Sequence, residues 1–165
     1  MQLRSILTAI LMLTVFGTAS AQTNQTNQTN QQNMKEVYDF ITECGEYYLA
    51  TVEDDQPRVR PFGTAVIFEN HLYIQTGKRK NVAKQMYANP KVEICAYNKQ
   101  TGIWLRIAAT VVPDERIVAK QYMLDNYPSL KSIYSATDDN TLVLYLKDAT
   151  ATFYSFGGDP REVRF

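Results

Sequence analysis

Short segments rich in β-forming residues follow one another through most of the chain, and turns rather than long helices join most of them. These segments lie at residues 47–53, 61–69, 72–76, 91–97, 103–112, 142–147 and 149–156. Asp, Asn, Gly and Pro between them mark tight turns. Because short turns join antiparallel neighbours, the pattern predicts a mainly β fold with an antiparallel sheet, and closure into a barrel would remove its edges.

The apolar spacing also predicts a few short helices. Val37, Phe40 and Ile41 recur at helical spacing within residues 34–44, and Gly45 ends that pattern. Further helices are expected at residues 81–88 and 114–125, with a short helical or irregular piece at 129–134.

The first 33 residues are expected to lie outside the folded domain. Residues 1–21 are typical of a secretory signal peptide, with Arg4 before an apolar stretch and small residues at the cleavage site. Residues 22–33 contain only Thr, Asn and Gln, which predicts a disordered linker. Residues 34–165 form one domain. The protein is thus expected to be exported, periplasmic or secreted, or cytoplasmic if translation starts at Met34.

Composition excludes several function classes. The chain has 17 Lys plus Arg and 17 Asp plus Glu, so it lacks the basic excess of a nucleic-acid binder, and no membrane contact is expected after signal cleavage. His71 is the sole histidine, which gives little support to a catalytic triad, and no Cys/His cluster predicts a metal. Cys44 and Cys95 fit either a disulfide or two buried thiols.

The positive charge gathers directly after the segment at 72–76. Gly77 is followed by Lys78, Arg79, Lys80, Asn81 and Lys84, and the chain then becomes helical. Cationic side chains at a helix N-terminus suit a phosphate, Thr76 can donate its hydroxyl, and Gly77 allows a close backbone approach. A solvated surface turn is the alternative.

Two further segments are candidate ligand contacts. In RVRPFGT, Arg58 and Arg60 precede Pro61, Phe62 and Gly63, and a flat ring could lie against this backbone; an ordinary edge strand is the alternative. Trp104 and Arg106 point the same way along a strand, and fit an aromatic ligand site or a core Trp beside a surface Arg.

The chain resembles the pyridoxamine 5′-phosphate oxidase-like family, the FMN-binding split barrels, in its short single-domain branch. The resemblance covers nearly all of residues 34–165. It is carried by ECGEYYLAT, PRVRPFG, LYIQTGKRKNVAKQMYANPKVEIC, WLRI and the closing ATFYSFGG.

The resemblance implies a dimeric split β-barrel of six to seven strands, with FMN in grooves between two protomers. Residues Arg60 to Gly63 would run along the flavin, and Gln75 and Thr76 would contact ring and phosphate. Lys80, Asn81 and Lys84 would belong to the phosphate-binding turn and helix, with Arg58 and Trp104 as further contacts. The chain lacks the C-terminal extension that binds pyridoxal phosphate in the oxidase itself, so oxidation of vitamin B6 is not expected.

The leading hypothesis is therefore an FMN-dependent oxidoreductase of an unidentified small molecule, because FMN supplies the redox chemistry that the side chains lack. The alternative is a non-catalytic module that binds or senses a flavin or haem. A third is a barrel that has lost its cofactor and serves as an interaction domain. The sequence does not separate FMN from a related flavin or deazaflavin.

Overall fold

The computed structural model describes residues 25–165, which belong to two units, Met1–Gln32 and Asn33–Phe165. In the first unit residues 25–32 are helical, and Thr29 Oγ1 donates a hydrogen bond of 3.0 Å to the carbonyl of Gln25. Composition predicted disorder for residues 22–33, whereas residues 25–33 are helical. Gln is an ordinary helix former, and Thr can bond back to the preceding turn without leaving the helix. The predicted signal peptide lies outside the described residues.

The second unit starts in a helix that ends at residue 44, where Gly45 reverses the chain with a φ of +76°. Met34, Val37 and Ile41 lie on one face of this helix and are buried in the main core. This spacing of three and four residues is the helical period that the sequence predicted.

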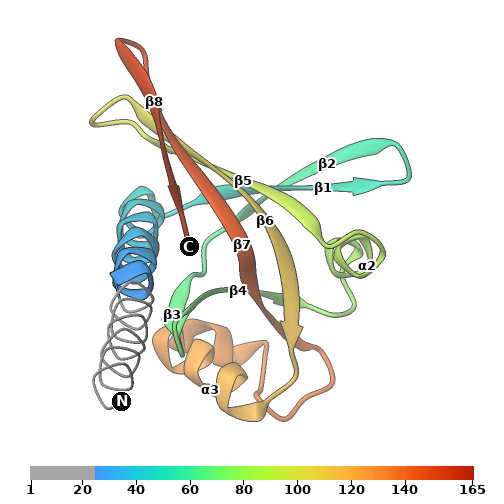
Figure 1. Ribbon diagram of the computed structural model, residues 1–165. Coiled ribbons are helices and arrows are strands. Elements are labelled where there is room, and N and C mark those ends of the chain that lie inside the picture. The colour runs from blue at the N-terminus through green and yellow to red at the C-terminus, as the bar shows by residue number, and fades with distance from the viewer. Residues whose placement is uncertain (1–24) are drawn as a thin grey trace, which may run out of the picture. The chain divides into compact units, whose positions relative to one another are not determined.

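Eight strands form a single antiparallel sheet in the described part of the chain (Figure 1). They are β1 (Tyr47–Glu53), β2 (Gln56–Phe62), β3 (Val66–Phe68), β4 (His71–Gly77), β5 (Lys91–Asn98), β6 (Ile103–Asp114), β7 (Thr141–Ser155) and β8 (Gly158–Arg164). The strand order is β2-β1-β5-β6-β7-β4-β3, and β8 also pairs with β7. Two α-helices, α2 (Asn81–Ala88) and α3 (Ile117–Asn126), and the 3₁₀-helix η1 (Pro128–Ser132) lie between strands.

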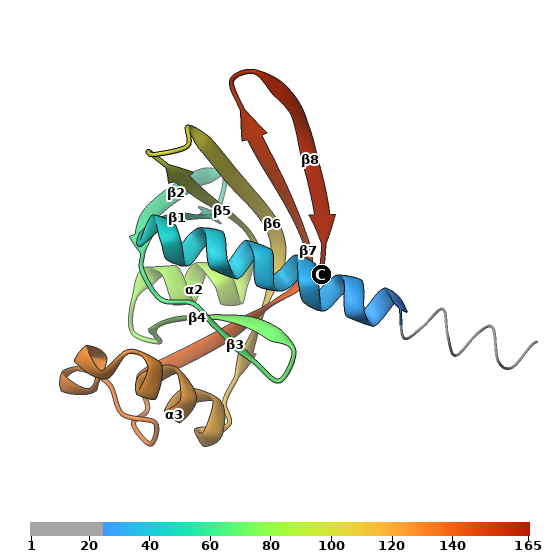
Figure 2. The same cartoon turned by 90° about the vertical axis from the view of Figure 1, so that its left-hand side faces the viewer.

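The long strands β6 and β7 divide the sheet into two parts. The first half of β7 pairs with β4 and the second half pairs with β8. Between the halves, Asp148 has a φ of +52°, and the β6–β7 register shifts between Ala108 and Thr110. Such an irregularity bends a strand pair. The β5–β6 and β7–β8 hairpins extend toward the same end of the unit (Figure 2).

The predicted mainly β, antiparallel split barrel is confirmed, with eight strands where six to seven were expected. The core lies inside the curved sheet and is lined by alternate residues of five strands, with Leu49, Ile74, Ile94, Leu105 and Leu144 almost fully buried. Helix α2 adds Val82, Ala83 and Met86 to this core. Burying one such Leu or Ile side chain stabilises the fold by about 1.5–3 kcal/mol.

Candidate functional site

A pocket of about 200 Å³ lies where β2, β4 and the start of α2 meet. It is lined by Arg60, Pro61, Phe62, Gly63, Thr64, Gln75, Thr76, Lys80 and Val82. Two motifs that are separate in the sequence therefore meet in one place: RPFG from β2 and the segment that runs from the end of β4 into α2. Gln75 and Thr76 are buried at the end of β4, whereas Lys80 is exposed.

The basic turn after β4 contains two kinds of cation. Lys78 Nζ lies 2.6 Å from Glu115 Oε2, and Arg79 Nη2 lies 2.8 Å from Asp139 Oδ1. Lys80 and Lys84 are exposed and have no carboxylate partner among residues 25–165. The positive charge that remains available at this turn is thus that of Lys80 and Lys84.

The start of α2 adds to this positive potential. Lys80 is the residue that precedes the helix, it makes no side-chain capping bond, and no acidic residue occupies the first turn. The first N–H groups of a helix have no acceptor within the helix, and the helix dipole favours an anion there. The arrangement of Lys80, Lys84 and the helix start can therefore hold a phosphate group.

The side chain of Arg60 is fixed by polar groups from β1 and α2. Its Nη1 donates to Thr51 Oγ1 at 2.7 Å and to the Leu49 carbonyl at 3.1 Å, and its Nη2 donates to Gln85 Oε1 at 2.7 Å. Gln85 is buried, and its Nε2 donates to Glu53 Oε1 at 3.2 Å. Burial, and secondarily the positive charge of Arg58, lowers the pKa of Arg60. Arg60 is thus a half-buried cation held at the edge of the pocket.

Two tyrosines hold the backbone that links β2 to β3. Tyr47 Oη donates to the Thr64 carbonyl at 2.8 Å, and Tyr127 Oη bonds both the N–H and the carbonyl of Ala65 at 2.9 and 3.0 Å. Burial raises the pKa of Tyr47 well above its usual value, so its hydroxyl stays a neutral donor. Thr64 Oγ1 is buried and has no hydrogen-bond partner in the described residues. Sequence reasoning did not select Thr64, although it follows Gly63 directly.

The structure brings seven of the twelve predicted residues into this pocket, and the other five lie outside its lining. Arg58 is exposed and forms an ion pair of 2.8 Å with Glu53. Asn81 and Lys84 are exposed on α2, one at its start and one a turn later. Trp104 lies on β6 and stacks on Tyr154 with ring centroids 5.4 Å apart.

Gly77 is the fifth residue outside the lining, and it is buried beside the loop before β7. A Cβ at this position would lie 3.1 Å from Tyr134 Oη and 3.2 Å from Asn140 Oδ1. The close approach that Gly77 allows in this structure is therefore to protein side chains.

The outer face of the sheet carries an exposed aromatic surface, which we call the aromatic face. Tyr48 is paired with Pro61 and Cys95, Tyr97 with Trp104, and Trp104 with Tyr154, so these side chains share one face. Phe156 follows Tyr154 and is 88% exposed. Cys95 also lies on this face as an exposed free thiol, because strand alternation points it outward, so neither of the two sequence alternatives, a disulfide or a buried thiol, holds for it.

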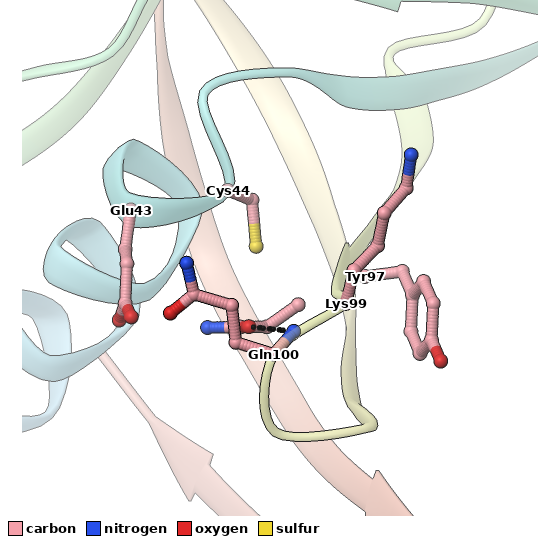
Figure 3. A pocket seen from close by; sticks show the side chains of 6 residues that line it. Glu43, Cys44, Tyr97, Lys99 and Gln100 are labelled. Carbon is pink, nitrogen blue, oxygen red and sulfur yellow. Dashed lines mark hydrogen bonds between the residues drawn. The ribbon is translucent and has the colours of Figure 1, made fainter.

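A second pocket, of about 230 Å³, lies between the end of the N-terminal helix and the β5–β6 turn. Figure 3 shows the Cys44 thiol pointing toward Gln100, in the space between Glu43 on one side and Tyr97 and Lys99 on the other. Burial, and secondarily Glu43, raises the pKa of the Cys44 thiol, so the reactive thiolate is disfavoured. Cys44 is also a free thiol, and no disulfide joins it to Cys95.

Two features are absent from residues 25–165. No cluster of three or more His, Cys, Asp or Glu side chains could hold a metal ion there. In the same range, no helix combines the length and the apolar character needed to span a membrane.

Comparison with known proteins identifies the family. A model of the family described as "Pyridoxamine 5'-phosphate oxidase" matches residues 34–129. A crystal structure of a NimC/NimA family protein from Clostridium acetobutylicum has 42% sequence identity and a TM-score of 0.81, and the match covers 86% of this chain and 98% of that one. None of the curated proteins compared with the chain matches it.

Two more distant structures share the fold. A pyridoxamine 5′-phosphate oxidase-related, FMN-binding protein from Nostoc punctiforme is 18% identical, with a TM-score of 0.57 over 86% of this chain and 95% of that one. The haem storage protein HutZ from Vibrio cholerae is 17% identical, with a TM-score of 0.54 over 68% of this chain and 87% of that one. The family model matches more than half of the chain. The match to the NimC/NimA family structure, at 42% identity, covers most of this chain and nearly all of that one. This chain therefore belongs to the pyridoxamine 5′-phosphate oxidase family.

Proposed function

We propose that this protein binds FMN in the pocket between β2, β4 and α2 and uses it to oxidise or reduce a small molecule. The observation that carries the proposal is the pair Lys80 and Lys84, the two cations at the basic turn that no carboxylate of residues 25–165 neutralises. An FMN-binding relative with the same fold gives independent support.

The residues of the pocket fit the two ends of FMN. Lys80, Lys84 and the start of α2 would bind the phosphate, with the Thr76 hydroxyl as a further donor. Pro61 to Gly63 would lie along the flat ring. Thr64 Oγ1 is buried without a partner in the described part of the chain, and an unpaired buried hydroxyl costs about 1–3 kcal/mol. A ligand atom within reach of its rotamers would relieve that cost.

The size of the pocket supports a dimeric site. Pockets for cofactor-sized ligands usually have volumes of about 300–1,000 Å³, whereas this pocket has about 200 Å³ in one chain. Pro61 lines the pocket and also belongs to the aromatic face, so a second protomer packed on that face would enclose the ligand further. Exposed aromatic clusters of this kind mark protein interfaces. In this arrangement the predicted contact from Trp104 would come from the second protomer.

Bound FMN would supply the redox chemistry, and the protein would supply binding and orientation. Arg60, held by Thr51 and Gln85, would place a positive charge beside the flavin. The nine lining residues include no Asp, Glu, His, Cys or Tyr. Their hydroxyl and amide groups can orient a ring or a substrate, and protons for the reaction would come from Lys80, from the second protomer, from solvent or from the substrate.

The second candidate is flavin binding without turnover, and the observation that favours it is that the lining formed by one chain contains no Asp, Glu, His, Cys or Tyr. Haem binding in this pocket is less well supported, although a haem storage protein shares the fold. Haem iron needs an axial His, Cys, Met or Tyr, none of which lines the pocket. Bound flavin that stays oxidised with every nicotinamide donor tested would favour the second candidate.

Replacing Lys80 and Lys84 together by Ala should lower the affinity for FMN by about 100-fold, since each charged hydrogen bond contributes about 1.5–3 kcal/mol at most and solvent screens part of it. Fluorescence titration with FMN measures the effect. The matched control K91A/K147A removes two exposed lysines on strands and should leave the affinity unchanged. Equal FMN affinity in K80A/K84A and the control would contradict the phosphate site.

A further inference from the structure

We infer that Asn140 is a positioning residue that fixes the basic turn, so that Lys80 and the start of α2 face a phosphate together. This inference rests on the proposed function, because it concerns the same site. Asn140 lies in the loop before β7, about sixty residues away in sequence, and it was not among the predicted site residues.

Asn140 holds two successive peptide groups of the turn. Its main-chain carbonyl accepts a hydrogen bond from Lys78 N at 2.7 Å, and its Oδ1 accepts one from Arg79 N at 3.2 Å. The turn closes on itself through Lys80 N, which donates to the Gly77 carbonyl at 3.1 Å. The backbone of residues 77–80 is therefore fixed on both sides before α2 begins.

Gly77 is part of the same arrangement. A Cβ there would lie 3.2 and 3.3 Å from the two amide atoms of Asn140, closer than most real contacts of this kind. The Asn140 side chain can reach Arg79 N because residue 77 has no side chain in the way.

Asn140 is in turn held by Asp138. Asp138 Oδ1 accepts hydrogen bonds from Asn140 N at 2.9 Å and Thr141 N at 2.5 Å, and Oδ2 accepts one from Ser135 N at 2.8 Å. One carboxylate thus organises the whole loop from Ser135 to Thr141, which is the loop that carries Asn140.

With the backbone of the basic turn fixed, its three successive cations point to different places. Lys78 is directed to Glu115 and Arg79 to Asp139, which leaves Lys80 to line the pocket. If the turn were loose, Lys80 and the helix N–H groups would have to be ordered when phosphate binds, and that ordering would weaken binding. The flavin ring, which contacts other residues, would be affected much less.

The test compares FMN with riboflavin, which has the same ring and no phosphate, on the full-length protein freed of bound flavin. Asn140→Ala keeps the main-chain contact to Lys78 N and loses the side-chain hydrogen bond from Arg79 N, so the ratio of FMN affinity to riboflavin affinity should fall by up to about tenfold, the upper end for one ordinary hydrogen bond. In Asn140→Ser, whose shorter hydroxyl can accept part of the hydrogen bond from Arg79 N, it should fall about threefold. The control Asn98→Ala removes a similar turn-capping amide, which accepts bonds from Gln100 N and Thr101 N, and should leave the ratio unchanged.

The outcomes separate this inference from the proposed function. A wild-type protein that binds FMN no better than riboflavin would overturn the phosphate site itself, and the inference with it. A wild-type preference for FMN that both folded Asn140 variants retain within about twofold would overturn the inference alone. Circular dichroism establishes which variants fold, and Asn140→Ser alone decides the matter if Asn140→Ala does not fold.

Discussion

At the scale of single residues, the candidate site depends on which charges are already neutralised inside the protein. The sequence shows a run of cations after β4, and all of them look equivalent there. In the structure Lys78 forms an ion pair with Glu115, and Arg79 forms one with Asp139. Lys80 and Lys84 have no carboxylate partner in residues 25–165. Both carboxylates lie far from the turn in sequence, so no local pattern could have separated the two classes.

Gly77 gives a test at this scale. Gly77→Ala should lower the free energy of unfolding by about 1–3 kcal/mol, because the new Cβ crowds Tyr134 and Asn140 in a packed environment. Urea unfolding measures the change. The control is Gly157→Ala, where a Cβ would meet nothing within 4 Å and the change should stay within about 0.5 kcal/mol. If the two variants were equally stable, the side chains of Tyr134 and Asn140 would be able to move away from the new Cβ with no loss of folding free energy.

At the scale of elements, local patterns predicted most of the secondary structure. The bounds of β1 and α2 agree with the expected residues 47–53 and 81–88. Both elements combine a clear apolar period with strong flanking signals, Gly45 before β1 and Pro90 after α2. In such segments local preference and tertiary packing favour the same conformation.

The differences lie where tertiary pairing decides the conformation. Residues 56–62 form β2 despite Pro57 and Pro61, because an edge strand tolerates proline. Residues 141–155 form one strand that runs through Asp148 with its positive φ, whereas two strands were expected at residues 142–147 and 149–156. β8 has no alternating apolar pattern, and its pairing with β7 is what makes it a strand.

The loop from Ser135 to Thr141 should make stability depend on pH in the acid range. Burial acts to raise the pKa of Asp138, but hydrogen bonds from backbone N–H groups outweigh it and lower the pKa to about 2. Because the pKa is lower in the folded chain than in the unfolded one, ionised Asp138 stabilises the fold above about pH 4. That contribution is lost as the pH falls toward 2.

Asp138→Asn should therefore be less stable than the wild type at pH 5, and the difference should shrink as the pH approaches 2. Chemical unfolding at a series of pH values measures this. Asp55→Asn, in the exposed β1–β2 turn, serves as the control. A constant difference between Asp138→Asn and the wild type across this range would show that the loop does not depend on the charge.

At the scale of the whole molecule, the proposed site requires a second copy of the chain on the aromatic face. Tyr48→Glu places a charge on this face, where Tyr48 is 52% exposed, so the fold should tolerate the change. We expect a dimer in the wild type, a monomer in the variant, and a parallel loss of bound FMN, since a buried unpaired charge opposes association. Sedimentation velocity and the flavin absorbance of each fraction measure both effects.

The control for this prediction is Ile133→Glu, which changes a side chain that is 69% exposed and lies after η1, away from the aromatic face. It should remain dimeric and keep its flavin. A Tyr48→Glu protein that stays dimeric would place the interface elsewhere, and a monomeric variant with full FMN content would show that one chain forms the complete site.

The absorbance spectrum of the purified wild-type protein, followed by identification of the released chromophore, tests the central claim most directly. We predict a yellow protein with a band at about 450 nm, from which FMN is released, or which gains that band when FMN is added. A colourless protein that takes up no FMN would contradict the account.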